Sequence, residues 1–202
     1  MHSSNLTLSR RGVLAGSAAL IALPHSALAL SPDQATALIR KVVDETNKIV
    51  NSGASKAQAL AQFETMFSRY ADVPIIARSV LGPPWRSASG AQQQAFVAAF
   101  QGYLARKYGS EFREYRGAQI DITKAVDQGN KGVVVSTIVR FPGEAPVAVD
   151  WQVSDRSGSP KAFNLFIEGV SMLSTERSEI SAILAQNRND LDAMIAALKS
   201  RG

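Results

Sequence analysis

The sequence predicts an α+β domain in which helices pack on a curved, four-stranded antiparallel sheet around an apolar cavity. Apolar residues recur at helical spacing from residue 35 to about 109, alternate with a period of two from 120 to 167, and return to helical spacing from 174. Strands that are grouped together between two sets of helices favour α+β over an alternating α/β fold.

Residues 1–29 have the pattern of a bacterial export signal. Arg10 and Arg11 precede a mostly apolar run, Val13–Leu23, and Ala27-Leu28-Ala29 forms a small-x-small cleavage site. Paired arginines are typical of the twin-arginine route. The run is about a dozen residues long and therefore shorter than the ~20 that span a bilayer. We expect cleavage after Ala29, a periplasmic location, and a single domain over 30–202.

Removing this leader changes which chemistry the chain can perform. His2 and His25 are the two histidines, and there is no cysteine, so the mature chain lacks imidazole and thiol. Ser-His-Asp and Cys-His catalysis, His/Cys metal sites and iron–sulfur clusters are excluded. The mature chain keeps 20 basic and 17 acidic side chains, a net charge of +3, without a dense basic cluster. We therefore expect no cofactor, metal or nucleic acid, and only transient membrane contact.

Four helices are predicted before residue 110. Capping boxes open three of them, because Ser31, Ser55 and Ser89 are each followed three residues later by glutamine. Asp72, followed by Pro74, opens a shorter helix that must end at Gly82-Pro83-Pro84. The last of the four is long and ends near Gly109 or Phe112.

Four strands follow, joined by short turns that favour an antiparallel meander. Their predicted ranges are Ile120–Val126, Gly132–Arg140, Val147–Val153 and Ala162–Ile167. A helix from Ser174 and a short final helix capped by Asn189 complete the chain.

Two segments carry a resemblance to a known family. One is Val80-Leu81-Gly82 with Trp85-Arg86 and Ala88-Ser89, before a helix with Phe96, Phe100 and Tyr108. The other is Phe163–Leu173, which includes Ile167-Glu168-Gly169-Val170-Ser171, followed by Arg177-Ser178-Glu179-Ile180. In order and spacing, the mature chain resembles the MlaC family, also called the toluene-tolerance family. It departs from that pattern at Glu176-Arg177, where relatives often carry Tyr-Arg, at Lys161-Ala162 and at Pro83-Pro84.

The resemblance implies a periplasmic protein with a cone similar to that of nuclear transport factors. It implies a deep apolar cavity for phospholipid acyl chains, and shuttling of lipid between an outer-membrane lipoprotein and an inner-membrane ABC transporter complex. One branch of the family accompanies hopanoid synthesis, so a hopanoid is the alternative ligand.

Apolar residues that face the space between helices and sheet are the candidate cavity lining, although solid core has the same signature. The candidates are Ile76, Val80, Phe96, Phe100, Leu104, Tyr108, Val135, Val149, Trp151, Leu165, Ile167, Met172 and Leu173. Arg86 is either a rim residue near a phosphate headgroup or a solvated neighbour of a Trp85 that packs the helix break, and the second interpretation is the simpler.

Two other function classes remain open. A hydrolase without histidine or cysteine would need paired carboxylates, for which Asp150 and Glu168 are candidates without supporting spacing. A binding module for a non-lipid small molecule or peptide would share the cavity and differ only in what it binds.

Overall fold

The structure is a computed structural model that describes residues 30–109 and 116–201. The predicted export signal lies outside the described residues, as does any continuation of the long helix beyond Gly109. No helix in these two described ranges is long and apolar enough to cross a membrane.

Within the described residues, five helices precede the sheet, and the predicted caps explain where four of them begin. Their bounds are α1 Pro32–Asn51, α2 Lys56–Tyr70, α3 Val73–Leu81, α4 Pro84–Ser87 and α5 Gly90–Gly109. The hydroxyls of Ser31 and Ser55 accept from the backbone three residues on, and the glutamine side chains return the bond. Ser89 and Gln92 do the same before α5. The single-turn α4 was not predicted and occupies the Pro-Pro break.

The strands form an antiparallel meander with the order β1-β2-β3-β4-β5. They are β1 Gln119–Asp127, β2 Val133–Arg140, β3 Val147–Ser154, β4 Lys161–Ile167 and β5 Val170–Ser171. A 3₁₀ turn, Gly129–Lys131, joins β1 to β2. The two-residue β5 is an addition to the four predicted strands, and it forms because Glu168 and Gly169 adopt positive φ and turn the chain back.

Two helices follow the sheet, α6 Met172–Gln186 and α7 Leu191–Leu198. The prediction that Asn189 caps the last helix is wrong. Asp190 is the cap, with its side chain accepting from Ala193 N at 3.0 Å, whereas Asn189 lies in the left-handed region that reverses the chain after α6.

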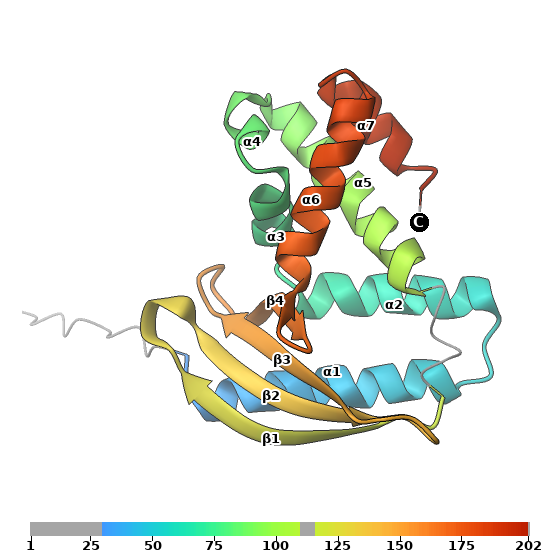
Figure 1. Cartoon of the computed structure of the whole chain (residues 1–202), viewed down its shortest axis with the longest axis vertical. Helices are drawn as coiled ribbons and strands as arrows, with labels where there is room; N and C mark the ends of the chain where they lie inside the picture. Colours follow the sequence, from blue (N-terminus) through green and yellow to red (C-terminus); the bar gives the residue numbers. More distant parts are fainter. Residues whose placement is uncertain (1–29, 110–115, 202) are drawn as a thin grey trace, which may run out of the picture.

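The fold has two cores, one between α1 and the sheet and one inside a bundle of helices (Figure 1). Helix α1 lies along one face of the sheet, where Ile39 packs with Val133, Val135 and Val153. Helices α3, α5, α6 and α7 form a bundle whose core includes Phe96, Phe100, Ile183 and other apolar side chains. Helix α2 lies between the two cores and contacts both α1 and α5. The space between the two cores is where the sheet, α1, α2 and the bundle meet.

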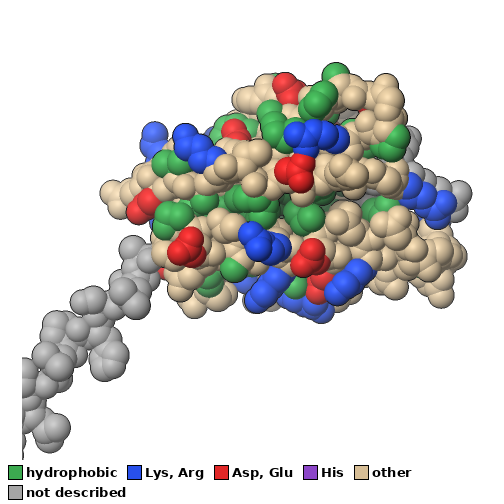
Figure 2. Space-filling view, turned by 90° about the horizontal axis from the view of Figure 1, so that it is seen from below, with side chains coloured by type: hydrophobic (Ala, Val, Ile, Leu, Met, Phe, Trp, Pro, Cys, Tyr) green, Lys and Arg blue, Asp and Glu red, His purple; other side chains and the backbone are tan. Residues whose placement is uncertain are grey.

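The face seen from the side of the sheet and α1 carries charges of both signs. Figure 2 shows hydrophobic side chains along the middle of this face, with lysines and arginines interspersed with acidic side chains around them. This face therefore has no extended basic surface of the kind that binds nucleic acid.

Candidate functional site

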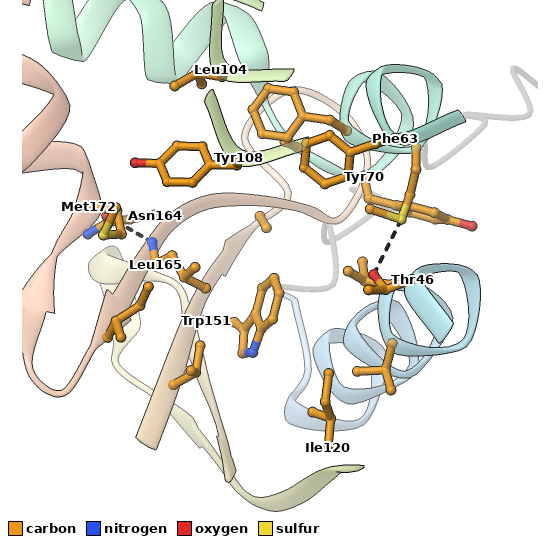
Figure 3. A pocket seen from close by; sticks show the side chains of 18 of the residues that line it. Thr46, Phe63, Tyr70, Leu104, Tyr108, Ile120, Trp151, Asn164, Leu165 and Met172 are labelled. Atoms are coloured by element: carbon orange, nitrogen blue, oxygen red, sulfur yellow. Dashed lines mark hydrogen bonds between the residues drawn. The ribbon is translucent and has the colours of Figure 1, made fainter. Parts of the chain in front are cut away.

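An apolar cavity of about 330 Å³ lies between the two cores. Its wall comes from α1, α2, α3, α5, α6 and from strands β1 to β4 (Figure 3). The volume falls within the ~300–1,000 Å³ range of small-molecule pockets. Apart from Thr46, Asn47, Asn164, Glu176 and the tyrosine hydroxyls, the wall-forming side chains are apolar.

The sheet contributes residues of β3 and β4 to the wall. Trp151 pairs with Leu165 across the two strands, and Val149 pairs with Ile167, so all four side chains share one face. The Trp151 Nε1 donates to Thr137 Oγ1 at 3.1 Å, and that hydroxyl donates to Val149 O at 2.9 Å. Because its one polar atom is satisfied, the Trp151 ring can present an apolar surface to the cavity.

Helices α1 and α2 close the side of the cavity opposite the sheet. Glu45 joins them by accepting from Arg69 Nη1 at 2.7 Å and from Tyr70 Oη at 3.0 Å. Within the wall, Thr46 Oγ1 donates to the Met66 sulfur at 3.6 Å (Figure 3). Of the fifteen residues in α2, Met66 alone is buried, and the side chains of α2 that border the cavity are Phe63, Met66, Phe67 and Tyr70.

A cluster of charged and polar side chains reaches the cavity where α5 meets α6. Glu176 Oε1 accepts from Lys107 Nζ at 2.8 Å and from Tyr108 Oη at 2.5 Å, and Lys107 also binds Glu179 at 2.5 Å. Burial and the hydrogen bond to Glu176 raise the pKa of Tyr108. Burial alone lowers the pKa of Lys107, but its hydrogen bonds to Glu176 and Glu179 outweigh that effect and raise it. The hydrogen bond from Lys107 lowers the pKa of Glu179.

The structure places nine of the thirteen predicted cavity residues on the wall and four in solid core. The nine are Ile76, Leu104, Tyr108, Val149, Trp151, Leu165, Ile167, Met172 and Leu173. Val80, Phe96 and Phe100 instead pack inside the helical bundle, and Val135 packs under α1. The placement of these four differs from the prediction because their apolar faces meet other side chains rather than the cavity. That the nine wall residues bind a ligand stays a prediction.

Arg86 does not lie on the cavity wall. It is exposed on α4, at the end of the bundle distant from the sheet, and Trp85 packs against the bundle core (Figure 1). The simpler interpretation of this pair therefore fits the structure better than a rim position. Asp150 and Glu168, the candidate hydrolase pair, also lie off the wall.

Sequence reasoning missed the contribution of α1 and α2. Wall residues from these helices include Val42, Val43, Val50, Phe63, Phe67 and Tyr70. Their helical periodicity identified an apolar face but did not show whether that face contacts other side chains or a cavity. Glu176 was missed as a wall residue too. It had a usable signal, since a carboxylate at the helical spacing of Leu173 and Ile180 interrupts an apolar stripe.

Known proteins share this sequence pattern and fold. A model of the MlaC protein family matches residues 40–200. The intermembrane phospholipid transport system binding protein MlaC of Haemophilus influenzae is 25% identical over 134 residues, which cover 64% of this chain and 62% of that relative. The match thus spans less than two thirds of the length of the relative.

A solved structure of the phospholipid-binding protein from Ralstonia solanacearum, in complex with a phospholipid, superposes with a TM-score of 0.72. The superposition covers 83% of this chain and 96% of that one, at 21% identity, a level at which the likeness shows a shared fold. Because the family model covers most of the chain, including helices of both cores and the whole sheet, this protein belongs to the MlaC family.

Proposed function

We propose that this protein is a lipid carrier, not an enzyme, that holds phospholipid acyl chains in the cavity between its two cores. The observation that carries the proposal is the cavity itself. An apolar ligand that covers this wall removes it from water, which is worth about 25 cal/mol per Å² of apolar surface. A fold that keeps so large an apolar space gains by filling it with an apolar ligand.

An apolar cavity suits transfer because it matches the environment that a membrane gives an acyl chain. At ~0.8 kcal/mol per buried methylene, a chain of about sixteen carbons is worth roughly 12 kcal/mol in either place. Transfer between membrane and protein is then nearly even in free energy and needs no chemistry by the carrier. Net direction must come from the partners at each end.

The relatives support the same proposal and suggest where the carrier works. One is named as part of an intermembrane phospholipid transport system, and the other was solved with a phospholipid bound. We therefore infer that residues 1–29 are an export signal, that residues 30–202 act in the periplasm, and that the protein passes lipid between an outer-membrane lipoprotein and an inner-membrane ABC transporter complex.

Detergent-free purification followed by native mass spectrometry and lipid extraction tests the proposal. A phospholipid that co-purifies supports it, and a triterpenoid would redirect it to hopanoids. A ligand-free mass, with no uptake from phospholipid vesicles, would contradict it.

Leu165→Asp and Phe166→Asp are matched variants for that experiment. They are neighbours on β4, and only Leu165 lies on the cavity wall. Because successive side chains of a strand point to opposite faces, we expect Leu165→Asp to abolish lipid occupancy and Phe166→Asp to keep it. Equal occupancy in the two folded variants would place the lipid elsewhere.

A further inference from the structure

One carboxylate in the cavity wall is only half satisfied by the protein. Glu176 is 4% exposed, and its Oε1 accepts from both Lys107 and Tyr108. Its Oε2 is buried and has no hydrogen-bond partner among the described residues. In those residues one other buried side-chain atom, Tyr103 Oη, shares this condition, and Tyr103 does not lie on the wall.

A buried carboxylate oxygen without a donor is unfavourable, because burial removes the water that would otherwise hydrogen-bond to it. Leu173 and Ile180 flank Glu176 on the same helical stripe, so an apolar residue at this position would continue the wall without that penalty. Such an orphaned acceptor at a ligand pocket points to a donor that the ligand supplies.

The surroundings of Glu176 restrict which donor fits. The Lys107 ammonium is already bound to Glu176 and Glu179, so a phosphate placed here would face two carboxylates. An ionised carboxylate only accepts hydrogen bonds, so its complement is a hydroxyl or an ammonium group. The Glu179 side chain is 41% exposed, so the cluster extends from the cavity wall to solvent.

We infer that Glu176 selects lipids that carry a hydrogen-bond donor, either an ammonium or a hydroxyl group, and accepts from it through Oε2. This inference rests on the proposed function, since the apolar wall binds the apolar part of the lipid while Glu176 accepts a hydrogen bond from its donor group. Because Oε2 is buried, the donor can bind only after the Glu176 carboxylate turns toward the cavity.

Competition between matched lipids tests the ammonium group. The protein is incubated with vesicles of equimolar phosphatidylethanolamine and phosphatidylcholine that have identical acyl chains and differ in N–H donors, and the bound lipid is extracted and weighed by mass spectrometry. We expect about tenfold enrichment of phosphatidylethanolamine, the selectivity of one charge-assisted hydrogen bond. Glu176→Gln should bring the ratio close to one.

Glu179→Gln is the matched control. It removes the other carboxylate bound to Lys107 but leaves the cavity wall intact, so the enrichment should remain. An enrichment that disappears in Glu179→Gln and persists in Glu176→Gln would overturn the assignment. Should Glu176→Gln fail to fold, an absence of enrichment in the unaltered protein would still overturn the inference.

A second pair tests the hydroxyl group. Phosphatidylcholine vesicles contain either a triterpenoid alcohol or the hydrocarbon with the same ring skeleton, and preferential uptake of the alcohol assigns the donor to a hydroxyl. Equal uptake within both lipid pairs would overturn the inference and leave the carrier function standing. Failure to take up any lipid would instead contradict the carrier function itself.

Discussion

Truncation of one core residue and one wall residue should separate packing from ligand binding. Phe100 is fully buried and stacks on Phe96 and Tyr103, with ring centroids 5.6 and 6.2 Å away. Phe100→Ala should therefore lower the free energy of unfolding by about 4 kcal/mol, the usual cost of removing a buried aromatic ring. Leu165 borders existing space, so Leu165→Ala should cost only about 1 kcal/mol in the protein without lipid.

Urea unfolding of the delipidated proteins, followed by circular dichroism, measures both values. For a domain of this size, 4 kcal/mol corresponds to a fall in Tm of about 8 to 16 °C. With lipid present the two variants should differ in lipid retention instead of stability. Leu165→Ala should retain less lipid, and folded Phe100→Ala should retain as much as the unaltered protein. Equal destabilisation by the two variants would mean that Leu165 packs in solid core, and the reasoning about the cavity would be refuted.

Three further predictions concern the turn, the polar cluster and the leader. In the turn before β2, a Cβ on Gly132 would lie 2.2 Å from a β3 carbonyl oxygen, so Gly132→Ala should cost about 3 kcal/mol in urea unfolding, and Gly129→Ala, with open space around it, about 1. The folded-state pKa of Tyr108 exceeds its ordinary value of 10.0, so its contribution to stability is present below pH 10.0 and is lost as the pH rises above it. Between about pH 9 and about pH 11, Tyr108→Phe should therefore lose less stability than the unaltered protein. Replacing Arg10 and Arg11 by lysine should retain the uncleaved precursor in the cytoplasm, and normal export on cell fractionation would contradict the twin-arginine assignment.

Local signals predicted most of the elements of this fold. Capping boxes at Ser31, Ser55 and Ser89 place helix starts because serine and glutamine side chains satisfy backbone N–H groups within four residues. The short turns between the predicted strands indicated the antiparallel order, because parallel neighbours need long connections. The sequence did not indicate β5, whose two residues depend on the reversal at Glu168 and Gly169.

The site was harder to predict because periodicity identifies an apolar face without its partner. Phe96 and Phe100 have the same helical signature as Leu104 and Tyr108, farther along α5, yet the first two pack only in the bundle and the last two also border the cavity. Which turn of a helix reaches open space depends on how far the neighbouring elements extend. Glu176 is different, because a charged residue within an apolar stripe is visible in the sequence and marks a position with a polar partner.

Quenching of a single tryptophan by a lipid with a brominated acyl chain tests the central claim most directly. The chain has two tryptophans; Trp151 lies on the cavity wall, and Trp85 packs against the bundle core. In Trp85→Phe, where Trp151 is the reporter, brominated phospholipid should quench most of the fluorescence. In Trp151→Phe, where Trp85 reports, the same lipid should leave the fluorescence almost unchanged. Equal quenching in both variants, or none in either, would contradict an acyl chain held between the sheet and the helices.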